Sequence, residues 1–282
     1  MTDTTHCLWG KNYACKTWHS ANQPVIVALH GWLDNAGSFD RIAPLLPNYH
    51  IIAPDFAGHG FSDYRSSDAG YNLWQDAGDI DQLLRNLSAD PVILMGHSRG
   101  GMISNILAAL YPERIKALVL LDGSMPGPVS AETSVAQLKN AFDDRRKYLD
   151  KPIRHYKQYD EAIQSRLRGP LPMSRDAIDI LATRGLAEDE DGYFWRADPR
   201  LRGASEVKFS IDQSNAFIRQ VQCPALLIAA ENSVGYHRQW LADNDNYQVK
   251  TVNGSHHLHL EETHGEVANM ISTFLTTIDE SG

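Results

Sequence analysis

The sequence is poor in cysteine and lacks any long apolar run. Its 282 residues include three cysteines, which form no metal-like cluster: Cys7, Cys15 and Cys223. A small, odd number of cysteines is typical of a reducing compartment and excludes a disulfide framework. No stretch approaches the roughly 18 apolar residues that a membrane-spanning helix needs, so we expect no membrane span.

The sequence also lacks a basic stripe and an internal repeat. The formal net charge is -9, which argues against nucleic acid as a partner. Residues 1–6 lack the basic and apolar regions of a signal peptide, and this predicts a cytoplasmic location. The apolar content of 43% is enough to form a sizeable hydrophobic core.

Short apolar runs alternate with segments of helical spacing. Loose alternation over residues 8–20 indicates one or two edge strands, and continuous apolar runs indicate buried strands at 24–29, 50–54, 91–95, 115–121 and 224–230. A last strand is predicted at 247–252. Helices are predicted at 35–46, 71–87, 102–110 and 264–278. Runs that are apolar throughout are typical of strands covered on both faces. The pattern therefore predicts an α/β fold, a mainly parallel sheet with helices on both faces.

The alternation stops between residues 125 and 220, which are charged and show helical spacing without a strong buried strand. We therefore expect a core made of residues 1–124 and 221–282, with residues 125–220 inserted as a helical cap, or lid. An insertion at this point lies over the carboxyl ends of the strands, where open α/β sheets bind their ligands.

A candidate nucleophile lies at Gly96-His97-Ser98-Arg99-Gly100, between a predicted strand and a predicted helix. A serine at such a strained corner exposes its hydroxyl, which suits nucleophilic attack. The Arg99 N–H lies at the start of the helix, where it can meet a developing negative charge.

Four motifs follow one another at predicted strand ends: His30-Gly31-Trp32, Asp55-x-x-Gly58-His59-Gly60-x-Ser62, Gly96 to Gly101, and Gly254-Ser255-His256. With these motifs the chain resembles the α/β-hydrolase superfamily over nearly its whole length. The phrases at 30–35, 195–201 and 256–260 resemble the serine-hydrolase-like group of capped hydrolases. The chain is more distantly similar to haloalkane dehalogenases. The resemblance implies an eight-stranded sheet.

The resemblance places a histidine base after the last strand, at His256. A serine hydroxyl needs such a base to remove its proton. His257 is expected to line the site or the surface and to contact substrate, and His259 to pack inside. No acidic or cysteine residue has ligand spacing with these histidines, so we expect no metal. The chemistry needs no cofactor.

The acid of the triad departs from the common pattern of the superfamily. Its usual place follows the seventh strand, where this sequence has Ser233. Some members place the acid after the sixth strand, and Asp122 occupies that position. We predict Asp122 as the acid, with Glu231 as the alternative. Asp122 could also merely cap the turn before Gly123.

The resemblance assigns the oxyanion hole to the backbone N–H groups of Trp32 and Arg99, and both residues are expected to contact substrate. The Arg99 side chain is predicted to pair with an acidic residue of the cap. The alternative is that it meets a carboxylate or phosphate of the substrate. Asp55 and residues 58–62 are interpreted as a structural turn.

These residues predict a carboxylesterase-like serine hydrolase, in which Ser98 forms an acyl-enzyme with a small-molecule ester or thioester. Ser98 argues against dehalogenase and epoxide-hydrolase chemistry, which need a carboxylate nucleophile. Carbon–carbon bond hydrolysis and cofactor-free haloperoxidase activity remain alternatives on the same triad. A further alternative is a catalytically silent protein that binds a small ligand. The chain is expected to be a monomer or a homodimer.

Overall fold

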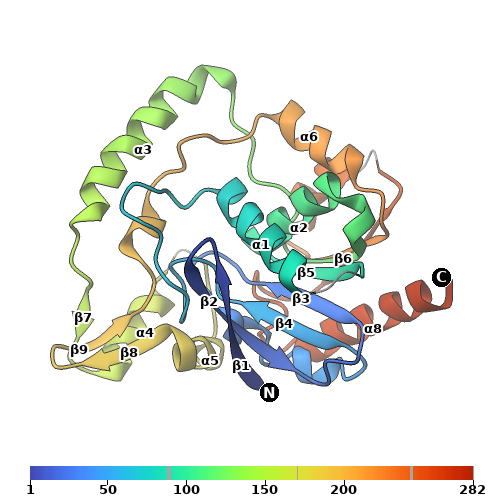
Figure 1. Cartoon of the computed structure of the whole chain (residues 1–282), viewed down its shortest axis with the longest axis horizontal. Coiled ribbons are helices and arrows are strands. Elements are labelled where there is room, and N and C mark those ends of the chain that lie inside the picture. The colour runs from blue at the N-terminus through green and yellow to red at the C-terminus, as the bar shows by residue number, and fades with distance from the viewer. Residues whose placement is uncertain (88–89, 170, 242–243, 282) are drawn as a thin grey trace.

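The centre of the molecule is an eight-stranded sheet (Figure 1). The computed structural model describes residues 1–87, 90–169, 171–241 and 244–281. The strands are β1 (Thr2–Leu8), β2 (Lys11–Trp18), β3 (Val25–Leu29), β4 (His50–Pro54), β5 (Val92–His97), β6 (Ile115–Leu121), β10 (Ala225–Ala230) and β11 (Tyr247–Val252). Their order is β1-β2-β4-β3-β5-β6-β10-β11. β2 pairs antiparallel with β1 and β4, and the other pairs are parallel. The predicted fold class is confirmed.

The strand order reverses at β3, and this reversal positions the site. The chain passes from β3 to β4 on one side and then returns to β5 on the other side of β3. The loops that follow β3 and β5 therefore diverge at the carboxyl edge of the sheet. Such a switch point is where open α/β sheets bind ligands.

Two apolar layers cover the sheet because successive residues of a strand face opposite sides. In β3, Val27 and Leu29 join a cluster with α1 (Leu73–Leu87), α2 (Arg99–Leu110) and α7 (Val234–Leu241). Ile26 and Ala28 join the other cluster, with α8 (His264–Ser281). Figure 1 shows α1 and α2 on one side of the sheet and α8 on the other.

The predicted helix at 35–46 is wrong in type. The chain forms two 3-10 helices there, η1 (Ala36–Phe39) and η2 (Ala43–Leu45). The Asn35 side chain accepts a hydrogen bond from the Gly37 N–H at the start of η1, and a proline stands at the start of η2. A third short 3-10 helix, η3 (Pro112–Arg114), leads into β6.

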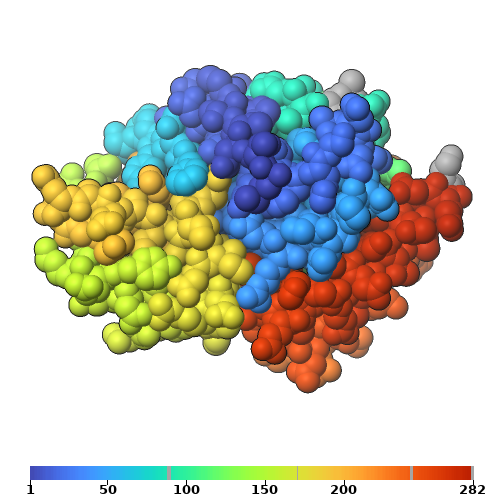
Figure 2. Space-filling model, turned by 90° about the horizontal axis from the view of Figure 1, so that it is seen from below, coloured from blue at the N-terminus to red at the C-terminus, as the bar shows by residue number. Residues whose placement is uncertain are grey.

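The segment between β6 and β10 lies beside the sheet (Figures 1 and 2). It contains η4 (Ala131–Thr133), α3 (Ser134–Leu149), α4 (Tyr159–Leu167), α5 (Arg175–Gly185), η5 (Pro199–Arg202) and α6 (Ile211–Gln220). It also forms a small antiparallel sheet of β7 (His155–Tyr156), β8 (Leu186–Asp189) and β9 (Gly192–Trp195). These short strands were not predicted because none forms a buried apolar run. α6 packs against α2 of the sheet layer.

Among the residues that the structure describes, no helix is both long enough and apolar enough to cross a membrane.

Candidate active site

Ser98 occupies a sharp corner between β5 and α2. Its backbone has φ 50° and ψ -111°, a conformation that side-chain-bearing residues rarely adopt. Hydrogen bonds hold the corner: the Ser98 N–H donates to the Leu121 carbonyl at 3.0 Å, and the Ser98 carbonyl accepts from Gly101 N–H at 3.0 Å. With this backbone conformation, Ser98 continues neither β5 nor α2, and the residue is half-buried. This is the geometry of a nucleophile elbow.

Two glycines allow neighbouring backbones to reach this corner. A Cβ at Gly100 would overlap the carbonyl of Leu29, and a Cβ at Gly123 would overlap the carbonyl of Ser98. Because glycine has no Cβ, α2 can lie against β3 and the loop after β6 can lie against the elbow. The residue before this second glycine is Asp122.

Asp122 and His256 come together beside the elbow. Asp122 directly follows β6 with φ 46°, and His256 lies in the loop after β11. The distance from Asp122 Oδ2 to His256 Nδ1 is 2.6 Å, and their side chains are 3% and 22% exposed. Since a carboxylate only accepts hydrogen bonds, Nδ1 carries the proton. Nε2 therefore keeps the lone pair that a base needs.

The second oxygen of Asp122 is also held. Oδ1 accepts from the Ala230 N–H at 3.1 Å and from the Ser233 hydroxyl. His237 Nε2, on α7, lies 3.4 Å from the same oxygen. Burial alone would raise the pKa of Asp122, but hydrogen bonds from His237, His256 and Ser233 outweigh it and hold that pKa well below its usual range. The carboxylate is therefore charged and fixed in direction.

This arrangement explains the serine at the usual position of the acid. Ser233 does not supply a charge, but it donates to the carboxylate that has moved to the end of β6. The side chain of Glu231, the alternative acid, is exposed. The structure brings Asp122, and not Glu231, to His256. Sequence reasoning missed His237, whose place on the face of α7 toward Asp122 depends on tertiary packing.

Trp32 and Arg99 present two backbone N–H groups near the elbow. Trp32 lies in the turn after β3, and its indole Nε1–H donates to the Leu201 carbonyl of the inserted segment at 2.9 Å. Arg99 begins α2. In the described part of the chain, no carbonyl accepts a hydrogen bond from either N–H. Neither N–H is therefore committed to a backbone carbonyl, and the oxyanion hole stays a prediction.

The Arg99 side chain has a partner in the core instead of the cap, which corrects the prediction. Its Nε and Nη2 donate to Asp76 Oδ2 at 2.9 and 2.5 Å, and Nη2 also reaches the Tyr71 carbonyl at 3.0 Å. Asp76 lies on α1 and also accepts from Arg65 at 2.9 Å. The pairing was missed because Asp76 reads as part of a polar helix face in the sequence.

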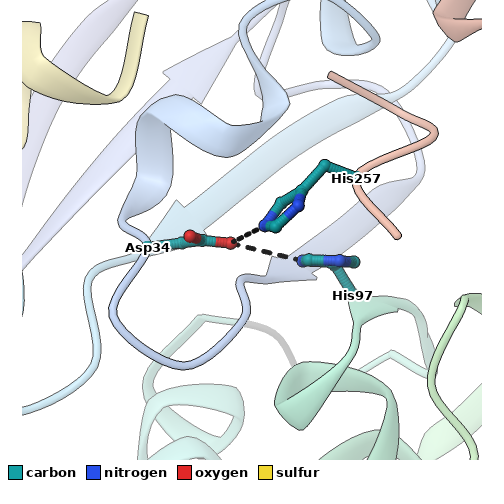
Figure 3. Close-up of side chains that lie close together, drawn as sticks. All are labelled: Asp34, His97 and His257. Carbon is teal, nitrogen blue, oxygen red and sulfur yellow. Dashed lines mark ion pairs between the residues drawn. The ribbon is translucent and has the colours of Figure 1, made fainter. Parts of the chain in front are cut away.

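His257 is buried instead of lining the site, so its position does not support the predicted contact with substrate. It is 2% exposed, and its Nε2 lies 3.3 Å from Asp34 Oδ2. His97 Nδ1 lies 3.4 Å from the same oxygen (Figure 3). His259 is fully buried and lies 2.9 Å from the Ser38 hydroxyl, in the interior where it was expected.

Asp34 is a site-adjacent residue that sequence reasoning missed. Within the described residues, Asp34, His97 and His257 each offer a ligand atom within 4.8 Å of the others, and so do the more exposed His155, Asp189 and Asp191. Arg166 Nη2 already lies 2.7 Å from Asp34 Oδ1. A divalent ion would add further positive charge to this buried group, which is costly. We therefore assign no metal or cofactor to it.

Comparisons with known proteins identify the family of this chain. The model of the α/β hydrolase fold family matches residues 24–263. A probable serine hydrolase of Drosophila melanogaster is 32% identical over 95% of this chain and 85% of its own length. Serine hydrolase-like protein 2 of Homo sapiens is 29% identical over 95% of this chain and 91% of its own length.

Solved structures show the same fold. A hypothetical protein of Pseudomonas aeruginosa PAO1 aligns with a TM-score of 0.92 and 34% identity, covering 98% of this chain and 100% of that one. The thioesterase domain of the curacin biosynthetic pathway aligns with a TM-score of 0.81 and 24% identity, covering 98% of this chain and 99% of that one. The chain therefore belongs to the α/β-hydrolase family and, within it, to the serine hydrolase-like group.

Proposed function

We propose that this hydrolase cleaves a carboxylic ester or thioester of a small molecule through an acyl-enzyme on Ser98. The observation that carries the proposal is the 2.6 Å contact between Asp122 Oδ2 and His256 Nδ1, next to a serine in a strained elbow. Together these residues form the nucleophile, base and acid that acyl transfer to water requires.

The steps follow from the protonation states. His256 Nε2 takes the Ser98 proton as Oγ attacks the carbonyl carbon. Asp122 stabilises the imidazolium that forms, and the N–H groups of Trp32 and Arg99 donate to the oxyanion. The imidazolium then protonates the leaving alcohol or thiol. Water, activated by His256, hydrolyses the acyl-enzyme and frees Ser98.

The Arg99 contacts bear on the substrate. Two of the guanidinium nitrogens are engaged by Asp76 and Tyr71. Breaking a buried, hydrogen-bonded ion pair costs several kcal/mol, so a substrate anion gains little from this cation. We therefore expect an uncharged acyl group next to the scissile bond. We also propose that the indole of Trp32, whose Nε1–H donates to the Leu201 carbonyl of the inserted segment, contacts that group.

The test is hydrolysis of p-nitrophenyl esters and acyl-CoA thioesters of graded chain length. Wild-type protein is expected to turn over at least one of these series, with Ser98→Ala reducing kcat by about a thousandfold or more. Turnover that survives Ser98→Ala would refute the acyl-enzyme. A folded protein that hydrolyses neither series would contradict the proposal. Cleavage of a carbon–carbon bond would then favour a carbon–carbon bond hydrolase, and binding of a ligand without turnover would favour a silent binding protein.

A further inference from the structure

Asp34 contacts four parts of the chain that meet at the site. It lies in the turn after β3 that also contains Trp32, with its N–H donating to the Gly31 carbonyl at 3.2 Å. Its Oδ2 lies 3.4 Å from His97, which precedes Ser98, and 3.3 Å from His257, which follows His256. Its Oδ1 accepts from Arg166 of α4. The backbone of Asp34 thus contacts the turn, and its side chain contacts the elbow, the histidine loop and the inserted segment. Figure 3 shows the side chain facing His97 and His257.

His97 extends this contact to the base. Its Nε2 lies 3.1 Å from the backbone carbonyl of His256, and a carbonyl only accepts, so this nitrogen is the donor. The ring centroids of His97 and His256 are 4.8 Å apart. His97 is fully enclosed at 1% exposure, which leaves its ring little freedom to turn. Burial lowers the pKa of His97 to about 4, so the ring is neutral and Nδ1, its other nitrogen, carries no proton. Nδ1 therefore lies beside Asp34 Oδ2 at 3.4 Å without donating a hydrogen bond to it.

The carboxylate at the centre of these contacts is charged. Burial would raise the pKa of Asp34, but His257 and Arg166 outweigh burial and hold that pKa well below its usual range. The side chain is 1% exposed. A buried charge with several fixed partners holds those partners in one arrangement, because each departure leaves it less compensated.

We propose that Asp34 is a positioning residue of the hydrolytic site. Through His257, whose Nε2 lies 3.3 Å from Oδ2, it holds the loop that carries His256, and through its own turn it holds the N–H of Trp32. The Arg166 contact makes this arrangement depend on the docking of α4. This inference rests on the proposed function, because it assigns Asp34 a role in the same reaction.

Asp34→Asn tests the proposal with little change in volume. A displacement of the base or the oxyanion donor by about 1 Å lowers acyl transfer by about a hundredfold. We therefore expect a fall in kcat, and in the rate of Ser98 acylation, of about 10- to 100-fold. KM is expected to change less than kcat, since Asp34 is buried away from substrate.

Asp55→Asn is the matched control. Asp55 is fully buried and accepts from Arg184 of α5 at 2.7 Å, so it too pairs with an arginine of the inserted segment. Both variants are expected to lower the melting temperature, but only the Asp34 variant is expected to slow acylation strongly. Equal losses of kcat in both, in proportion to lost stability, would reduce Asp34 to a structural role and overturn the proposal.

A readout that does not need activity separates this inference from the proposed function. In protein with isotope-labelled histidine, the His256 Nδ1–H signal is assigned by its loss in His256→Gln. We expect Asp34→Asn to displace that signal and Asp55→Asn to leave it in place. An unmoved signal in the Asp34 variant would overturn the positioning role. Failure of wild-type protein to acylate would instead overturn the proposed function, and the histidine signal would still decide the role of Asp34.

Discussion

Replacement of Asp122 by asparagine tests the acid of the triad. Oδ1 of Asp122 accepts from two donors, the Ala230 N–H at 3.1 Å and the Ser233 hydroxyl. In Asp122→Asn the amide oxygen must remain there, so the amide NH₂ faces His256 Nδ1. That nitrogen then accepts, its proton moves to Nε2, and Nε2 can no longer take the Ser98 proton.

The loss should be large because the wrong tautomer disables the base. Serine triads that lose the carboxylate in this way lose about ten-thousand-fold in kcat, which corresponds to about 5.5 kcal/mol of transition-state stabilisation. The assay is kcat for the best ester at neutral pH, with circular dichroism to verify the fold. Glu231→Gln is the control, and because its side chain is exposed we expect kcat within about twofold of wild type. Full turnover by Asp122→Asn, with loss in Glu231→Gln, would refute the reasoning.

Two further predictions follow from the buried polar groups. Ser233→Ala removes a donor to the charged Asp122 carboxylate, so kcat should fall about tenfold, and unchanged steady-state kinetics would show that this contact does not matter. Burial lowers the pKa of His30 to about 3 and of His59 and His97 to about 4, so the unfolded chain binds more protons below its histidine pKa of about 6.5. The free energy of unfolding should therefore be highest above about pH 6.5 and should fall between about pH 6.5 and 4. At about pH 5 the loss should be about 2 kcal/mol for each of these histidines. Denaturant titrations at both ends of that range check this, and a flat profile would contradict it.

Much of the fold could be predicted because buried parallel strands have a distinctive pattern. β6 (Ile115–Leu121), a buried apolar run, has the predicted bounds. The edge strand β11 (Tyr247–Val252) also has the predicted bounds, although it is mostly exposed. The strands of the small sheet are not predictable in this way, because β8 and β9 are partly exposed hairpin strands with no buried apolar run. The 3-10 turns of 35–46 share helical spacing with an α-helix, so spacing alone could not separate them.

The candidate site shows a similar division. Ser98, Asp122 and His256 lie at strand ends, and the topology of the sheet alone brings strand ends together. Their supporting contacts are different, since they join residues far apart in sequence. The pairing of Asp34 with His257 and that of Arg99 with Asp76 depend on how loops and helices pack, and neither leaves a local pattern.

Covalent labelling of Ser98 tests the central claim most directly. Wild-type protein is treated with a fluorophosphonate, and the adduct is mapped by peptide mass spectrometry. The account predicts one adduct, on Ser98, that is absent in Ser98→Ala and strongly slowed in His256→Gln. A folded protein that is not labelled, or that is labelled at another residue while Ser98 stays free, would contradict it.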